Sequence, residues 1–229
     1  MKKITIALDG FSSTGKSTVA KKLAKHLGYV YVDTGAMYRA VTLYALEKGY
    51  VGNSESNFDA LVDDLPKLKL AFKVNEISNN SEIHLNGENV EGQIRNLTVS
   101  GQVSKVAAIP EVRKKLVEQQ QQMGLEKGIV MDGRDIGTVV FPNAELKIFM
   151  TASAEQRAQR RYKELLDRGE EISYEAVLKN VKERDYIDSN RAASPLRKAD
   201  DAIAFDNSDL SFNEQFELIL AKVKEKLQA

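Results

Sequence analysis

The 229-residue chain has no cysteine, only two histidines and no excess of charge of either sign. Without cysteine there can be no disulfide framework, no thiolate metal site and no cysteine nucleophile. Lys plus Arg and Asp plus Glu both total 33, so no global field draws the chain to a nucleic acid polymer. Any anion-binding site must therefore be local, and we expect small molecules as partners.

Long apolar runs are also missing. The first run follows Met1-Lys2-Lys3 and stops at Asp9, which is too short for the apolar core of a signal peptide. No stretch approaches the ~18 apolar residues of a membrane span. We therefore expect a cytoplasmic protein that associates with no membrane, and we take a monomer as its expected state.

Five short apolar or β-prone runs alternate with helical patterns along most of the chain. They lie at residues 4–8, 29–32, 129–131, 146–150 and 202–205. Such alternation predicts an α/β fold, with a five-stranded parallel sheet flanked by helices on both faces. Four of the five runs are followed directly by an acidic residue: Asp9, Asp33, Asp132 and Asp206. Ligands bind outside the carboxyl ends of such strands, so we expect these carboxylates to gather at the functional edge of the sheet.

Residues 49–122, between the second and third of these runs, have a different sequence pattern. Between Leu68 and Val74, apolar residues alternate with lysine and alanine, which is the period of a half-buried strand. Asn86-Gly87 stands between two short strand-like segments and predicts a type I′ hairpin turn. Residues 49–122 are therefore expected to contain a small antiparallel sheet.

The segment 153–192 is charged and helical in pattern, and its apolar positions are too sparse for a buried element. Two interpretations fit this pattern equally well. The segment is either a mobile lid or a solvated pair of helices.

The segment from Gly10 to Ser17 satisfies the phosphate-loop pattern G-x-x-x-x-G-K-[ST] between the first strand and a helix beginning near Lys16. Glycines let consecutive N–H groups point at phosphate oxygens, and the helix adds its positive end. Lys16 would bridge the β and γ phosphates of ATP, and the Ser17 hydroxyl would ligate Mg²⁺. The expected ATP-contacting residues of this loop are Gly10, Phe11, Ser12, Ser13, Thr14, Gly15, Lys16, Ser17 and Thr18.

The class of phosphate-loop protein can be narrowed. A switch GTPase normally has an Asn/Thr-Lys-Xaa-Asp segment that reads guanine, and this sequence has none. ATP-using kinases and ATPases are therefore the leading classes.

Three further motifs carry a resemblance to one family. They are Asp33-Thr34-Gly35-Ala36-Met37-Tyr38-Arg39, the segment 132–142 that begins Asp132-Gly133-Arg134-Asp135, and the segment 184–191, Arg-Asp-Tyr-Ile-Asp-Ser-Asn-Arg. Together with the phosphate loop they resemble the bacterial cytidylate kinases over nearly the whole chain. The resemblance implies a P-loop NTPase-type core of residues 1–36, 123–152 and 193–229. It also implies a nucleoside-monophosphate-binding domain over 37–122, with a strand-rich insert at about 63–95, and a helical lid over 153–192.

The family resemblance also implies an activity, namely Mg²⁺-dependent, in-line transfer of the γ-phosphoryl of ATP to CMP and to dCMP. By position in the motifs, the implied catalytic residues are Lys16, Asp132, Arg134, Arg184 and Arg191. The implied acceptor-binding residues are Thr34, Tyr38, Arg39, Ser104, Arg113, Asp132, Gly133, Arg134, Asp135, Arg184, Asp188 and Arg191. Arg157, Arg160 and Arg161 fall in the lid segment that resembles the family's ATP-contacting helix.

The spacing of the arginines can be interpreted without the family. Arg184, Asp188 and Arg191 are four and three residues apart and would share one helix face. From spacing alone, an exposed Arg184–Asp188 ion pair is the simpler interpretation. By contrast, two acids and an arginine directly after a buried strand, as in 132–135, have no packing purpose and favour a functional role.

The choice of acceptor bears on the need for a base. A nucleotide phosphate has its second pKa near 6, so at pH 7 the attacking oxygen is mostly unprotonated and needs no base. This agrees with the position of His26 and His84, which stand beside no motif and which we interpret as structural.

Other functions stay open at this point. The acceptor could be UMP, dTMP or AMP, or a hydroxyl group as in shikimate and sugar kinases, with Asp33 or Asp132 as base. A non-catalytic ATP-binding module and an ATP phosphohydrolase are the alternatives from other classes.

Overall fold

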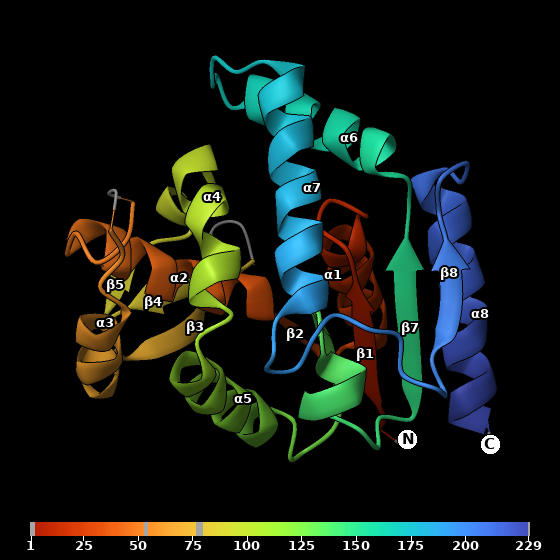
Figure 1. Cartoon of the computed structure of the whole chain (residues 1–229). Coiled ribbons are helices and arrows are strands. Elements are labelled where there is room, and N and C mark those ends of the chain that lie inside the picture. Colours follow the sequence, from red (N-terminus) through yellow and green to blue (C-terminus); the bar gives the residue numbers. More distant parts are fainter. Residues whose placement is uncertain (1–2, 53–54, 77–79, 229) are drawn as a thin grey trace. The chain divides into compact units, whose positions relative to one another are not determined.

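A computed structural model describes residues 3–52, 55–76 and 80–228 of the chain (Figure 1). The chain divides into two compact units. The first consists of Met1–Asp33 together with Gln120–Ala229, and the second of Thr34–Gln119. Each unit has its own sheet and is described by itself.

The first unit is built on a five-stranded sheet in which every pair of neighbours is parallel. Its strands are β1 (Thr5–Gly10), β2 (Val30–Asp33), β6 (Ile129–Gly133), β7 (Leu146–Thr151) and β8 (Ile203–Asp206). They lie in the order β2-β6-β1-β7-β8. The predicted five-stranded parallel sheet is confirmed, and β1, which leads into the phosphate loop, is its central strand.

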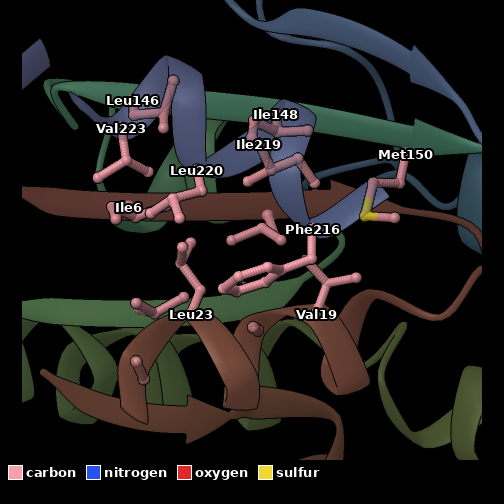
Figure 2. Close-up of a cluster of buried hydrophobic side chains, with 14 of the residues drawn as sticks. Ile6, Val19, Leu23, Leu146, Ile148, Met150, Phe216, Ile219, Leu220 and Val223 are labelled. Atoms are coloured by element: carbon pink, nitrogen blue, oxygen red, sulfur yellow. The ribbon is translucent and has the colours of Figure 1, made fainter. Parts of the chain in front are cut away.

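The helices of the first unit are α1 (Lys16–Leu27), the π-helical turn η3 (Ile136–Val140), α6 (Ala154–Asp167), α7 (Tyr174–Asn190) and α8 (Phe212–Gln228). Two of them, α1 and α8, cover one face of the sheet through a cluster of buried side chains (Figure 2). Ile6 and Leu8 of β1 belong to this cluster. Because side chains alternate along a strand, Asp9 points to the opposite face, where η3 contacts β1.

The second unit carries the predicted small antiparallel sheet, with β3 (Leu70–Val74), β4 (Ser81–Leu85) and β5 (Glu88–Asn89) in that order. Asn86 and Gly87 connect β4 to β5 with φ angles of 51° and 95°. Positive φ at both central positions defines a type I′ turn, so the predicted hairpin is confirmed.

Helices make up the rest of the second unit: α2 (Thr34–Glu47), α3 (Phe58–Asp64), η1 (Leu65–Lys67), η2 (Gln93–Arg95) and α4 (Leu97–Val106). A further helix, α5 (Pro110–Met123), begins in this unit and ends in the first. Asp64 at the end of α3 accepts hydrogen bonds from the hydroxyls of Tyr44 and Tyr50, both at 2.8 Å. These bonds tie α3 to α2 and to the segment that follows it.

The predicted gathering of carboxylates holds for three of the four residues. Asp33 and Asp132 are register partners on β2 and β6, and Asp9 lies on the neighbouring β1; all three are buried. The prediction was wrong for Asp206, which is exposed on the edge strand β8 and accepts a hydrogen bond from the Ser208 N–H at 2.9 Å. The order of the strands explains this, because β7 separates β8 from β1.

Candidate functional site

The turn after β1 has the backbone geometry that a phosphate loop needs. Gly10 has a φ of 141°, and a Cβ atom there would lie 2.0 Å from the Met150 carbonyl oxygen, so only glycine fits. Ser13 and Gly15 also have positive φ angles, of 59° and 88°. The chain therefore curls tightly before α1 begins at Lys16, and it presents the amino end of that helix to the loop.

Lys16 lies inside this loop. Its ammonium group donates to the Phe11 carbonyl at 2.6 Å and to the Thr14 hydroxyl at 3.4 Å, and the side chain is buried. Burial lowers the pKa of Lys16 below its ordinary value, and the nearby positive charge of Arg134 lowers it further. A desolvated ammonium of this kind gains most from a partner with negative charge.

Asp132 connects the loop to the end of β6. Its carboxylate accepts hydrogen bonds from the Ser17 hydroxyl at 2.9 Å and from the Tyr31 hydroxyl at 2.7 Å. Burial raises the pKa of Asp132, and the neighbouring charge of Asp33 raises it further. The two carboxylates repel one another, so a cation bound here would be stabilised.

Residues from two distant motifs meet in an arginine cluster, which we define as Arg134, Arg184 and Arg191 with the carboxylates Asp135 and Asp188. Nε of Arg134 contacts Asp188 at 3.0 Å, across 54 positions of sequence. Arg191 lies 3.9 Å from Asp135 and 4.0 Å from Asp188. Arg134 and Arg191 thus share the two carboxylates, and the charges of Arg134 and Asp188 also act on Arg184. With three guanidinium groups and two carboxylates, the cluster has an excess of positive charge.

The burial of this cluster decides between the two interpretations of the 184–191 spacing. Arg184 and Asp188 are 8% and 4% exposed, so they do not form the exposed surface pair that spacing alone favours. Burial lowers the pKa of Arg184 to about 10, and the charge of Arg134 adds to this effect. Placing arginines together against mutual repulsion is costly for folding and is typical of anion-binding sites.

The predicted lid segment forms the helices α6 and α7, which pack against one another (Figure 1). The helices bury charged side chains, although the apolar positions of this segment were too sparse to predict a buried element. Arg157 is 3% exposed and pairs with Asp185 of α7 through both of its terminal nitrogens, at 3.0 and 2.6 Å. It also donates to the Ser12 carbonyl of the phosphate loop at 3.3 Å.

The other two lid arginines differ in their surroundings. Arg160 donates to the carbonyl of Thr14 at 3.4 Å and to Asn207, so it also reaches the phosphate loop. Arg161 pairs with Glu164 of its own helix at 2.9 Å.

Five of the predicted acceptor-binding residues lie in the second unit: Thr34, Tyr38, Arg39, Ser104 and Arg113. The guanidinium of Arg113 is 5.4 Å from the centre of the Tyr38 ring, and it donates to the carbonyl that follows α4 at 3.1 Å. Ser104 is 3% exposed, and its hydroxyl has no hydrogen-bond partner among the described residues. Thr34 begins α2 and is buried, and Arg39 donates to a carbonyl of η2 at 3.5 Å. This set offers the buried hydroxyls of Thr34 and Ser104 and two guanidinium groups within one unit.

Sequence reasoning missed Tyr31 and Asn207 as parts of the site, and it placed Asp9 there only as one of the carboxylates at the edge of the sheet. Tyr31 supports Asp132 through its hydroxyl, and Asp9 holds the start of η3 by accepting from the N–H groups of residues 136 and 137. Asn207 is fully buried beside the phosphate loop. The position of Asp9 directly before the loop was a usable signal, whereas Asn207 belongs to no motif.

A comparison with known families decides where this arrangement belongs. The family model described as cytidylate kinase matches residues 6–225. The chain belongs to the cytidylate kinase family. Membership in this family confirms the resemblance that the three motifs carry, and it implies ATP as co-substrate.

Relatives of the family support the assignment along the entire chain. A cytidylate kinase of Flavobacterium johnsoniae is 65% identical over 225 residues, covering 98% of both chains. One of Bacteroides fragilis is 54% identical and covers 100% of both.

A solved structure adds support for the fold alone. An uncharacterized protein from Eubacterium ventriosum is similar with a TM-score of 0.50 at 14% identity, covering 98% of this chain and 99% of its own. None of the helices in the described ranges has the length and apolar character needed to cross a membrane.

Proposed function

We propose that the chain transfers the γ-phosphoryl group of ATP to CMP, and also to dCMP, and that it forms the nucleoside diphosphate and ADP. The observation that carries this proposal is the match to the cytidylate kinase family over residues 6–225, in which the arginine cluster and the phosphate loop both fall. The names of the relatives favour CMP over UMP, dTMP and AMP as acceptor.

The chemistry that the site must perform is mainly electrostatic. The acceptor phosphate is a dianion at pH 7, so its oxygen can attack without a general base. Two polyanions must instead be held in line while negative charge spreads over the transferring group. Lys16 and the arginine cluster provide fixed positive charge for this purpose. In the arginine cluster, Arg134 is now paired with Asp188, and a phosphate would compete with that carboxylate for the guanidinium.

Each predicted residue keeps its proposed role. Gly10 to Thr18, with Arg157, Arg160 and Arg161, are proposed to bind ATP. The residues proposed to contact the acceptor are Thr34, Tyr38, Arg39, Ser104, Arg113, Asp132, Gly133, Arg134, Asp135, Arg184, Asp188 and Arg191. The residues proposed to be catalytic are Lys16, Asp132, Arg134, Arg184 and Arg191. The role of Lys16 is predicted by the phosphate-loop pattern alone, whereas the other four roles rest on the family resemblance.

Mg²⁺ fits the oxygen atoms beside the phosphate loop. The Ser17 hydroxyl lies 2.9 Å from the Asp132 carboxylate, so two hard oxygen groups stand next to each other. The described residues form no cluster of three or more histidine or acidic side chains that could hold a metal ion. Few protein ligands are what Mg²⁺ needs when nucleotide phosphates and water complete its shell. Bound there through Ser17, it would neutralise phosphate charge.

The domain boundaries are also a proposal. We propose a core of residues 1–36, 123–152 and 193–229, an acceptor-binding domain over 37–122 and a lid over 153–192. A lid should close when both nucleotides bind, because a kinase must keep water from the γ-phosphate. Limited proteolysis would test this, since cleavage within 153–192 should slow in the presence of a bisubstrate analogue. Equal cleavage rates would contradict the lid.

The proposed cellular compartment follows from the substrates. ATP and CMP are nucleotides of the cytosol, so we propose the cytoplasm as the place of action. A monomer is the proposed state, because all the proposed ligand contacts come from one chain. Size-exclusion chromatography with light scattering would test it.

A coupled assay of ADP release would test the proposed activity. We expect CMP and dCMP to be phosphorylated fastest in a panel that also contains UMP, dTMP and AMP. ADP release without any acceptor would instead indicate a hydrolase, and binding of ATP without ADP release would indicate a non-catalytic module.

A pair of variants links this activity to the arginine cluster. Arg134→Ala should lower kcat by about 100-fold or more, since it removes a charge proposed to contact the transferring group. Arg168→Ala is the matched control, because Arg168 is an exposed arginine of the same unit that pairs with Glu164. Equal kcat values for the two variants would contradict the assignment.

A further inference from the structure

Asn207 is a fully buried polar residue at the carboxyl end of the sheet, directly after β8. Its side-chain N–H₂ donates to the Thr14 carbonyl of the phosphate loop at 2.6 Å and to Oε1 of Gln215 in α8 at 2.8 Å. Its side-chain oxygen accepts a hydrogen bond from Arg160 of α6 at 3.2 Å. Both polar atoms of this amide are therefore engaged, which fixes its orientation.

The backbone of Asn207 is held as well. Its N–H donates to the carbonyl of Thr151 at the end of β7 at 3.0 Å, and its carbonyl accepts from Arg160 at 3.0 Å. Gln215 in turn donates to the Leu210 carbonyl at 2.9 Å, so the acceptor of the Asn207 amide is itself fixed. The end of the sheet, α6 and α8 thus converge on one amide that contacts the phosphate loop.

The contact with Thr14 has a consequence for the next peptide group. A trans peptide is planar, so its carbonyl and the following N–H point in opposite directions. By fixing the Thr14 carbonyl, Asn207 also fixes the direction of the Gly15 N–H, which is one of the donors expected to face phosphate. Gly15 has a φ of 88°, a conformation that glycine adopts without resistance, so an external contact is needed to hold this peptide in place.

We propose that Asn207 is a positioning residue for ATP, which orients the Thr14–Gly15 peptide of the phosphate loop and presents Arg160 beside it. This inference rests on the proposed function and adds to it a residue outside all of the motifs. Asn207 acts through the loop and is not itself a catalytic residue. Its removal should therefore weaken productive ATP binding and leave the affinity for CMP unchanged.

The test compares Asn207→Ala with Asn207→Asp, using steady-state kinetics in both substrates. Asn207→Ala should raise the KM for ATP about tenfold, equivalent to about 1.4 kcal/mol, without changing the KM for CMP. Asn207→Asp keeps an acceptor for Arg160 but places a carboxylate oxygen against the Thr14 carbonyl. Its KM for ATP should therefore rise at least as much. Asn213→Ala is the control, because Asn213 is exposed on the same helix as Gln215 and its side-chain oxygen accepts a hydrogen bond from the exposed Lys22 at 3.4 Å.

Three results would overturn the proposal. A lower melting temperature of Asn207→Ala with both KM values unchanged would make the residue merely structural. Full recovery of the KM for ATP in Asn207→Asp would assign the effect to Arg160 alone. If Asn207→Ala fails to fold, Gln215→Met can replace it, because this variant removes the Gln215 oxygen that accepts from the Asn207 side chain and leaves Asn207 in place. An unchanged KM for ATP in Gln215→Met would then refute the proposal.

Failure of the proposed function can be told apart from failure of this inference. Wild-type protein that does not phosphorylate CMP would refute the proposed activity. Titration with ADP by calorimetry would still test Asn207, because the loop binds phosphates whatever the acceptor is. Weaker binding by Asn207→Ala than by Asn213→Ala supports the positioning role, and equal binding excludes it.

Discussion

Replacing Asp9 by asparagine should make the stability of this protein less dependent on pH and should also lower its kcat. The Asp9 carboxylate accepts hydrogen bonds from the N–H groups of Ile136 and Gly137, at 2.8 and 2.7 Å. An asparagine side chain has one oxygen, so it can accept only one of these bonds and must turn its own N–H₂ toward the other donor. The start of η3, which follows Arg134 and Asp135 in the chain, should then shift.

The effect on stability depends on pH. Burial raises the pKa of Asp9 from 3.8 to about 6, against the backbone hydrogen bonds that lower it, and the charges of Asp135 and Lys16 act in opposite directions. The folded state therefore holds this proton more tightly than the unfolded state, and the free energy of unfolding falls as the pH rises from about 4 to 6. The full shift corresponds to about 3 kcal/mol. Between pH 4.5 and 7, wild-type protein should lose about 2 kcal/mol more than Asp9→Asn.

Urea denaturation at pH 4.5, 5.5 and 7, together with kcat at pH 7, would measure both effects. We expect the stability of Asp9→Asn to change less with pH, while its kcat falls about tenfold or more because the arginine cluster is displaced. Glu145→Gln is the control, since the Glu145 carboxylate accepts the N–H of Thr5 at 2.8 Å near the other end of β1. Parallel pH curves for Asp9→Asn and wild type, or equal kcat values for Asp9→Asn and Glu145→Gln, would refute the reasoning.

Further substitutions examine the loop and the arginine cluster. Lys16→Ala should abolish phosphoryl transfer while the circular dichroism spectrum stays that of a folded protein; retained CDP formation would exclude Lys16 from the mechanism. Gly10→Ala should lower the free energy of unfolding by about 3 kcal/mol, because its Cβ would meet the Met150 carbonyl, and wild-type stability in urea would contradict this. Arg191→Lys should lower kcat at least tenfold, since lysine cannot make the two bonds of Arg191 to the Ser194 carbonyl, at 2.9 and 2.7 Å; an unchanged kcat would argue against a role for its planar guanidinium.

Local patterns predicted the local structure of this chain well. The glycine spacing between Gly10 and Gly15 predicted a curled loop before a helix, and Asn86-Gly87 predicted the turn type. Both predictions succeed because the steric freedom of a few adjacent residues determines the geometry. The parallel sheet followed from the alternation of short apolar runs with helical patterns.

Contacts between distant segments of the chain could not be predicted from the sequence as well. Helical spacing related Asp188 to its neighbours on α7, but its 3.0 Å partner Arg134 comes from the turn after β6. The lid segment, with few apolar positions, was interpreted as either mobile or solvated, and no pattern shows that Arg157 would be buried by pairing with Asp185. Such pairs depend on tertiary structure, which periodicity along one helix does not contain.

The order of strands in the central sheet also has a consequence for biosynthesis. The strand partners of β1 are β6 and β7, which begin at Ile129 and Leu146, and β2 pairs with β6. During translation, neither of the first two strands can join its sheet until more than half of the chain has been made. The nascent protein must therefore keep two strand edges from mispairing for that time, a period in which binding by a chaperone would be most useful.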